Sequence, residues 1–242
     1  MIFFIFFNFV ANFIGLSKWS DLYLDKKRLI IFLFLVLSLI ISSGWFAEFL
    51  HWNEQRTGYV FNDLFLNSFH SYNFSFLIGI LTHGAIFISL FLLFDKPINV
   101  AYFLCAAILM IIFRSITLYL LPLEPPLSII PLKDPVLEFT FYKGEVLLKD
   151  LFFSGHTANI ILMAMLSESK TLKRSMVLIA IVVGSLLLIQ HVHFTIDVIA
   201  APFFAIIVYK LGIFTVNRIF AIEDIYIKRC ANLRIEFGFR NE

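Results

Sequence analysis

Long runs of apolar residues constrain the fold of this chain more than any other feature. Residues 29–47, 74–94, 98–113 and 198–209 carry no Asp, Glu, Lys or Arg. A helix needs about 20 mostly apolar residues to cross the hydrocarbon core of a bilayer. The sequence therefore predicts an all-α fold, a polytopic membrane bundle of helices.

The overall composition supports one membrane domain without a soluble domain attached. Hydrophobic residues make up 60% of the 242 residues, charged residues make up 15%, and the mean hydropathy is +0.91. A soluble domain is nearer half apolar, with its apolar residues dispersed along the chain. The net charge of +2 is too small to indicate nucleic-acid binding.

The apolar runs predict six transmembrane helices, with ends uncertain by several residues. They are expected at residues 30–49, 74–94, 98–121, 152–167, 175–191 and 194–214. Residues 1–28 contain Trp19 and a basic cluster at 26–28, which favour an N-terminal interfacial helix, with a seventh span as the alternative. The expected divisions are this segment, a membrane domain over 29–215, and a basic cytoplasmic tail over 216–242.

The basic residues predict the orientation of the bundle. With six spans, 14 of the 19 Lys and Arg residues fall on the side of the two termini, and 5 fall on the other side. Because positive residues accumulate in the cytoplasm, both termini are expected inside the cell. The expected location is an integral membrane position, taken as a bacterial inner membrane, with residues 122–151 and 191–194 on the outer face.

Three polar clusters interrupt the apolar chain at or near membrane depth. They span residues 114–119, 150–157 and 191–198. Polar and ionisable side chains are costly inside a membrane, and by default they mark candidate functional sites. The predicted topology brings all three clusters to the outer face.

The third cluster suggests a nucleophile with an orienting partner. His193 and Asp197 are four residues apart and share one face if a helix begins there. A carboxylate bonded to one imidazole nitrogen fixes the tautomer and leaves the other nitrogen free as a base or nucleophile.

The first two clusters suggest groups that bind a phosphate. Ser154 and Gly155 precede a predicted helix, whose exposed N–H groups and positive end suit a phosphate oxygen. His156 is then placed to donate a proton to a leaving oxygen. Arg114 offers a planar, permanently charged fork for a phosphodiester.

These motifs resemble those of the phosphatidic acid phosphatase type 2 superfamily, and the sphingomyelin synthase-like branch looks closest. The resemblance covers roughly residues 30–215. The Asp-X-X-X-Ser-Gly-His-Thr pattern is met by Asp150, Ser154, Gly155, His156 and Thr157. The His-Tyr-Thr-X-Asp-Val pattern is met by His193, Phe194, Thr195, Asp197 and Val198, with Phe in place of Tyr. The Arg-X-X-Thr-X-Tyr pattern before Leu-Pro is met by Arg114, Thr117, Tyr119, Leu121 and Pro122.

The resemblance implies roles for eight residues. His193 would be the nucleophile, Asp197 its orienting partner and His156 the proton donor. The residues expected to bind substrate are Arg114, Tyr119, Ser154, Gly155 and Thr157. No cofactor and no metal are expected, because Cys, His and carboxylates do not cluster at metal-ligand spacing.

The expected function is a lipid phosphotransferase that moves a phospholipid headgroup phosphate to a lipid hydroxyl. Its partners would be a membrane phospholipid and a lipid-alcohol acceptor. One alternative is a lipid phosphatase that uses water as the acceptor. Another is a non-catalytic membrane scaffold or transporter, in which the polar clusters glue helices together. His191 flanks the site and is expected to support it or to contact the headgroup, whereas His51, His70 and His83 are expected at interfaces or in packing contacts.

Overall fold

The computed structural model describes residues 19, 22 and 26–236, with side chains described as far as residue 219. Most of the expected interfacial segment at residues 1–28 therefore lies outside the described residues. Within it, Trp19 is buried against the bundle, where its indole N–H donates a 2.8 Å hydrogen bond to the carbonyl of Phe94.

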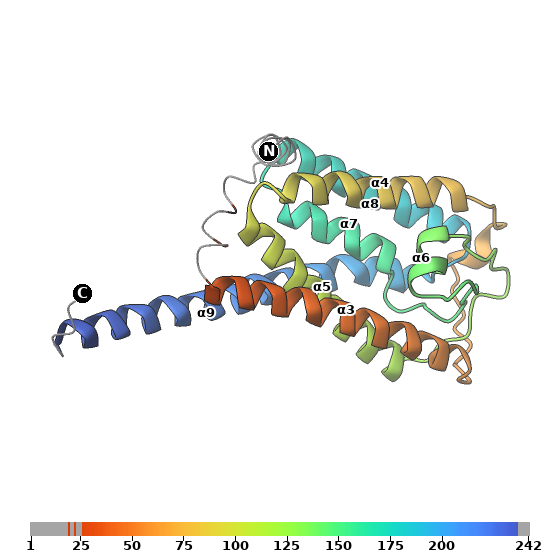
Figure 1. Cartoon of the computed structure of the whole chain (residues 1–242). Helices are drawn as coiled ribbons and strands as arrows, with labels where there is room; N and C mark the ends of the chain where they lie inside the picture. The colour runs from red at the N-terminus through yellow and green to blue at the C-terminus, as the bar shows by residue number, and fades with distance from the viewer. Residues whose placement is uncertain (1–18, 20–21, 23–25, 237–242) are drawn as a thin grey trace, which may run out of the picture.

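The described chain is an antiparallel bundle of helices, shown in Figure 1. In chain order the helices are α3 (Lys26–Glu54), α4 (Ser75–Leu93), α5 (Pro97–Leu120), α6 (Pro135–Thr140), α7 (Gly155–Leu166), α8 (Lys170–Ile189) and α9 (Thr195–Glu236), with the 3₁₀ turn η2 (Leu66–Ser68) between α3 and α4. No strand occurs among the described residues, apart from one isolated bridge between Tyr59 and Leu123. The predicted all-α membrane bundle is confirmed.

Among the described residues, five helices are long and apolar enough to cross a membrane: α3, α4, α5, α8 and the part of α9 over Thr195–Ile219. The expected span at residues 152–167 corresponds to α7, which has only 12 residues. At 1.5 Å per residue this helix is about 18 Å long, short of a hydrocarbon core about 30 Å thick. The first turn of α7 can therefore lie below the membrane surface, and the chain before it enters the bundle.

The helix ends differ from the predicted ends for two physical reasons. Charged residues at the membrane surface continue the helices, so α3 begins at Lys26 and α8 at Lys170, several residues before the apolar runs. By contrast, α7 begins three residues later than predicted, because Ser154 caps it and the preceding Phe153 is fully buried in non-helical chain. Helix α9 continues past residue 216, so the expected tail begins as an extension of this helix beyond the bundle (Figure 1).

Small residues let the central helices approach closely. A side chain at Gly212 of α9 would meet the backbone of Ala106 on α5 at about 3.2 Å. The main core lies between α5, α7 and α9, and it contains Ala158, Ala201 and Ala205. Small residues at such crossings allow the close backbone contact that stabilises helix pairs in membranes.

The two ends of the bundle differ in character. One end holds the short α4–α5 and α7–α8 connections and the start of α3. The other end holds the long connections over residues 55–74 and 121–154 and the α8–α9 turn (Figure 1). All three polar clusters lie toward this second end, which we call the loop end.

Candidate active site

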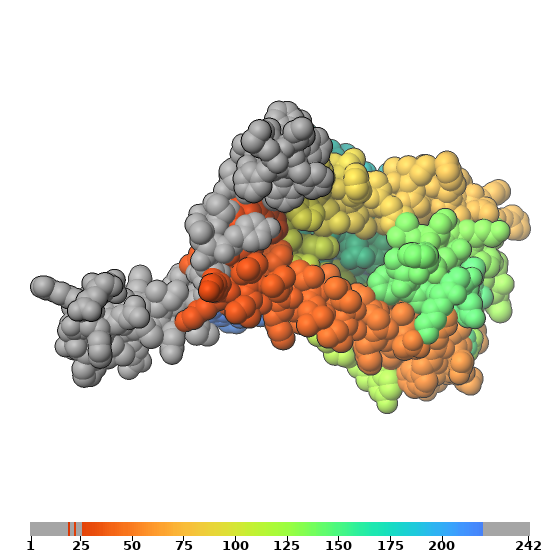
Figure 2. Space-filling view, viewed as in Figure 1, coloured from red at the N-terminus to blue at the C-terminus, as the bar shows by residue number. Residues whose placement is uncertain are grey.

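A cavity of about 310 Å³ opens near the loop end of the bundle. Its walls come from α3, α4, α5 and α7, together with the connection before α7 and the α8–α9 turn. The space-filling view shows a hollow between α3 and α4, with α7 at its floor (Figure 2). Helix α3 packs on α5, and α4 packs on α7 and α8, so α3 and α4 are separated along this hollow.

The paired residues of the third cluster lie at one wall of this cavity. His193 lines the cavity, and its Nδ1 lies 3.3 Å from Oδ2 of Asp197. The same Asp197 oxygen accepts a 3.0 Å hydrogen bond from the backbone N–H of Phe194. His193 Nε2 has no protein partner among the described residues. The predicted His193–Asp197 pair is therefore formed, with one imidazole nitrogen available to a ligand.

Two polar side chains hold the α8–α9 turn that carries His193. Asp63, from the connection after α3, accepts a 2.6 Å hydrogen bond from the Thr195 N–H at the start of α9. Burial alone would raise the pKa of the Asp63 carboxyl, but hydrogen bonds from Thr195, Leu66 and Phe65 outweigh it and lower the pKa. Gln190 is fully buried and binds the Phe74 N–H through Oε1 at 2.7 Å.

His156 is joined to an aspartate that the sequence did not point to. The Nε2 atom of His156 lies 3.1 Å from Oδ2 of Asp134, which caps the short helix α6. His83 of α4 approaches the same carboxylate, with its Nε2 at 2.9 and 2.8 Å from the two oxygens. His83, expected at an interface or in a packing contact, thus also binds the carboxylate that contacts His156.

Asp134 is ionised in this arrangement although only 1% of it is exposed. Burial by itself would raise the pKa of its carboxyl, but the hydrogen bonds from His156 and His83 outweigh the burial and hold the pKa well below its usual range. A carboxylate accepts hydrogen bonds only, so each imidazole presents its Nε2–H to Asp134. His156 Nδ1 then has no protein partner among the described residues, and the side chain lines the cavity.

The Ser-Gly-His segment forms the start of α7. The Ser154 hydroxyl accepts from the Thr157 N–H and donates to the Thr157 hydroxyl, so it caps the helix. Thr157 lies near Gly184 of α8, on the side of α7 that faces the protein. Neither Ser154 nor Thr157 lines the cavity, whereas Gly155 and His156 do. The structure gives Ser154 and Thr157 a structural role in placing the first turn.

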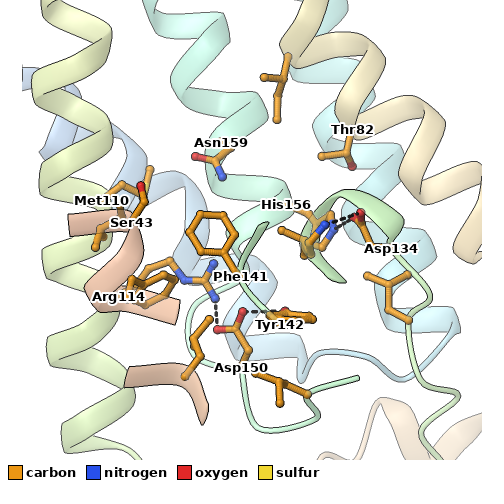
Figure 3. Close-up of a pocket in the computed structure, with 18 of the residues that line it drawn as sticks. Ser43, Thr82, Met110, Arg114, Asp134, Phe141, Tyr142, Asp150, His156 and Asn159 are labelled. Atoms are coloured by element: carbon orange, nitrogen blue, oxygen red, sulfur yellow. Dashed lines mark hydrogen bonds and ion pairs between the residues drawn. The ribbon is translucent and has the colours of Figure 1, made fainter. Parts of the chain in front are cut away.

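Arg114 lies directly against Gly155. A Cβ atom at Gly155 would overlap a nitrogen of the Arg114 guanidinium. The guanidinium forms an ion pair with Asp150, and Tyr142 donates a 3.0 Å hydrogen bond to the other oxygen of that carboxylate (Figure 3). Burial and the neighbouring Asp150 charge raise the pKa of the Tyr142 hydroxyl, so it stays protonated as a donor.

Tyr119 lies outside the cavity. Its ring stacks on Trp52 with 6.1 Å between ring centroids, and the Arg56 guanidinium lies over both rings. The residue is 57% exposed at the loop end. The structure therefore does not bring Tyr119 to the other predicted substrate-binding residues.

Within the part of the chain that the structure describes, no group of three His, Cys, Asp or Glu residues could hold a metal ion. The carboxylate of Asp134 instead pairs with His83 and His156. A reaction without a metal stays a prediction.

Comparison with known proteins finds a similarity over part of this site. Residues 149–215 match the family model described as PAP2 superfamily C-terminal. The match supports the PAP2 superfamily. It spans His156, His193 and Asp197 but not Arg114, and it does not separate the sphingomyelin synthase-like branch from others. No curated protein and no solved structure matches the chain significantly.

The structure thus brings His193, His156, Arg114 and Gly155 to one cavity, with Asp197 behind His193. Asp134 was missed because its role depends on a contact with α7, a helix that starts 21 residues later. One local signal was available: Asp134-Pro135 is typical of a helix start, with Asp as the cap and Pro in the first turn. The apolar helices indicate a membrane protein, and residues 149–215, which carry His156, His193 and Asp197, are similar to the PAP2 superfamily.

Proposed function

We propose that this protein is a lipid phosphotransferase that moves the headgroup phosphate of a phospholipid to the hydroxyl of a second lipid through a histidine intermediate. One observation carries the proposal: His193, backed by Asp197, and His156, backed by Asp134, line one cavity with Arg114. The hollow between α3 and α4 gives this cavity a side opening in the membrane-spanning part of the bundle (Figure 2). Lipid chains can leave through that opening while the phosphate remains among polar groups.

The first step forms a bond between His193 Nε2 and phosphorus. The bond from phosphorus to the oxygen of the lipid alcohol breaks. His156 enters this step protonated on both ring nitrogens beside the Asp134 carboxylate, and it gives the proton on its cavity-facing Nδ1 to that oxygen. The charge that develops on His193 is stabilised by Asp197, which already faces Nδ1. The Arg114 guanidinium and the N–H groups at the start of α7 face the phosphate oxygens.

The second step reverses the first with a new alcohol. His156 takes the proton of the acceptor hydroxyl, whose oxygen attacks phosphorus and breaks the bond to His193. Splitting one displacement into two in this way lowers each barrier. With water as the acceptor, the same site would be a lipid phosphatase, and the PAP2 similarity is compatible with both reactions.

The test uses purified protein in nanodiscs and a phospholipid with a radiolabelled headgroup phosphate. We expect label to appear in an acid-labile, base-stable bond to the protein, and then in a lipid product when diacylglycerol is added. His193→Ala should abolish both signals, and His156→Ala should slow labelling strongly. Release of water-soluble labelled product alone, unaffected by diacylglycerol, would assign the phosphatase instead. Absence of labelled protein and of any product would contradict the enzyme and favour a scaffold or transporter.

A further inference from the structure

The cavity continues beyond the histidines into the apolar part of the bundle, and polar side chains are present there too. Asn159 of α7, Thr82 of α4 and Ser43 of α3 all line it, among apolar neighbours such as Met110 and Ile86 (Figure 3). None of the three is ionisable, and none belongs to the hydrogen-bonded groups around Arg114 or Asp134. The transfer mechanism above uses none of them.

Asn159 is positioned relative to the reacting centre by the helix itself. It follows His156 by three residues, so both side chains lie on the same face of α7, about 4.5 Å apart along its axis. Its amide makes no hydrogen bond with any described residue, although it offers two N–H donors and a carbonyl acceptor. An amide inside a membrane bundle without a partner is costly, because no water is present to replace the bond.

Thr82 of α4 is a second polar residue of this cavity whose side chain has no hydrogen-bond partner within the described chain. The residue is only 2% exposed. A threonine in a helix usually bonds to a carbonyl one turn earlier, which Thr82 does not do. Two polar groups on neighbouring helices are therefore left without protein partners at one level of the same cavity.

The chemistry of a membrane lipid fits this level. In a two-chain lipid, the ester or amide carbonyls lie a few bonds from the oxygen that carries the phosphate, on the side of the hydrocarbon chains. With that oxygen at His156, the carbonyls reach one helical turn deeper, toward the opening between α3 and α4. An amide N–H or a hydroxyl donates well to a carbonyl oxygen, and neither adds a charge to the membrane interior.

We propose that Asn159 and Thr82 form a subsite for the backbone carbonyls of the lipid, both of the leaving diacylglycerol and of the acceptor. This inference rests on the proposed function for the orientation of the lipid. The subsite holds the free hydroxyl of a neutral lipid beside His193 and His156. It thereby favours an acceptor lipid over water, which has no carbonyl to bind.

The experiment compares two neutral lipids that differ only in these carbonyls. Dioctanoylglycerol has two ester groups, and dioctylglycerol has ether links in their place with the same free hydroxyl and chains of the same length. Binding of each to purified protein in detergent is measured directly, without any phosphate chemistry. We expect the wild type to bind the diester about tenfold more tightly than the diether, the effect of a hydrogen bond to a buried polar group.

Asn159→Leu should bring the two affinities to within about twofold, and Thr82→Val should reduce the preference at least threefold. Thr215→Val, a change of the same kind on α9 away from the cavity, is the matched control and should keep the wild-type preference. Retained diether binding shows that each variant still has an intact cavity.

An unchanged preference in either variant would overturn the assignment of that residue, and no preference in the wild type would overturn the subsite. The proposed function fails separately. A protein that binds the diester selectively but transfers no phosphate keeps the subsite and loses the transferase. A protein that transfers phosphate without any preference for the diester keeps the transferase function and loses the subsite.

Discussion

Asp134 Oδ2 lies 3.1 Å from His156 Nε2, so a residue between α5 and α7 orients the histidine that faces the cavity. The same carboxylate holds His83 of α4. Asp134 also caps α6 by accepting from the Val136 and Leu137 N–H groups. One buried side chain thus ties the loop before α7 to two helices of the site.

Asp134→Asn should slow turnover about 10- to 100-fold while KM for the lipid changes by less than threefold. An asparagine puts an NH2 group in the place of one accepting oxygen. That group faces either the two imidazole N–H groups at Oδ2 or the Val136 and Leu137 N–H groups at Oδ1, so hydrogen bonds are lost in either orientation. Steady-state kinetics on a phospholipid substrate measures the two effects separately. Glu138→Gln, on α6 but not lining the cavity, is the control and should behave as the wild type. A large rise in KM with normal kcat would instead make Asp134 part of lipid binding.

The same substitution should lower the melting temperature in a pH-dependent way. The folded pKa of Asp134 lies far below that of an unfolded aspartate, about 3.9. Stability from this carboxylate is therefore fully present above about pH 4 and is lost as the pH falls toward the folded pKa. Thermal unfolding in detergent should show the wild type above Asp134→Asn at pH 7 and pH 5, with a difference that shrinks below about pH 4. A difference that disappears already at pH 6 would contradict an ionised, hydrogen-bonded Asp134.

Asp197→Asn should leave lipid binding nearly unchanged and reduce turnover by a factor between about 10² and 10⁴. Asp197 is fully buried behind His193 and accepts from its Nδ1, so it reaches a substrate only through the imidazole. An asparagine can turn its NH2 group to Nδ1 and impose the wrong tautomer, which in the serine-protease triad costs about 10⁴ in rate. Binding of a phospholipid and single-turnover labelling of the protein distinguish the two quantities. Loss of binding with a normal rate for bound lipid would assign Asp197 to headgroup recognition.

Gly155→Ala should abolish most activity while the protein still folds. The new methyl group would occupy the space of the Arg114 guanidinium, which must then move away from Asp150 and the start of α7. Because the displaced atoms are the end of a flexible side chain, the fold can adapt, but the phosphate loses its charged partner. Gly84→Ala on α4 is the matched control, since nothing lies within 4 Å of its new methyl group. Equal activity in the two variants would show that Arg114 has no part in the reaction.

Much of the fold could be predicted, because a helix that crosses a membrane must be long and apolar enough to span its hydrocarbon core. The apolar runs predicted α3, α4, α5, α8 and α9, since length and hydropathy alone decide which segments can span a membrane. Their ends could not be predicted as well, because Lys26 and Lys170 show that helices continue into charged residues at the surface.

Some residues of the candidate site could be predicted from the sequence, and others could not. His193 and Asp197 were predictable as a pair because a helix places residues four apart on one face. Tyr119 was grouped with them from a motif. It follows Arg114 by five residues, about 140° around the helix, and so lies on Trp52 at the exposed end of α5. Asp134 and Asn159 could not be assigned roles, because their positions in the cavity depend on how α7 packs against α4 and the preceding loop.

The loop end of the bundle, and the active site with it, should face away from the cytoplasm. Fourteen of the 19 Lys and Arg residues fall on the side of the termini, and positive residues are retained inside during insertion. The test introduces single cysteines into a Cys105→Ala/Cys230→Ser background. Leu127→Cys lies in the α5–α6 connection at a position that is 98% exposed, and Thr171→Cys lies in the exposed first turn of α8 at the opposite end. A membrane-impermeant thiol reagent added to intact cells should label Leu127→Cys at once and Thr171→Cys only after the membrane is opened. The reverse pattern would place the cavity on the cytoplasmic face, and the lipid substrate would then come from the inner leaflet.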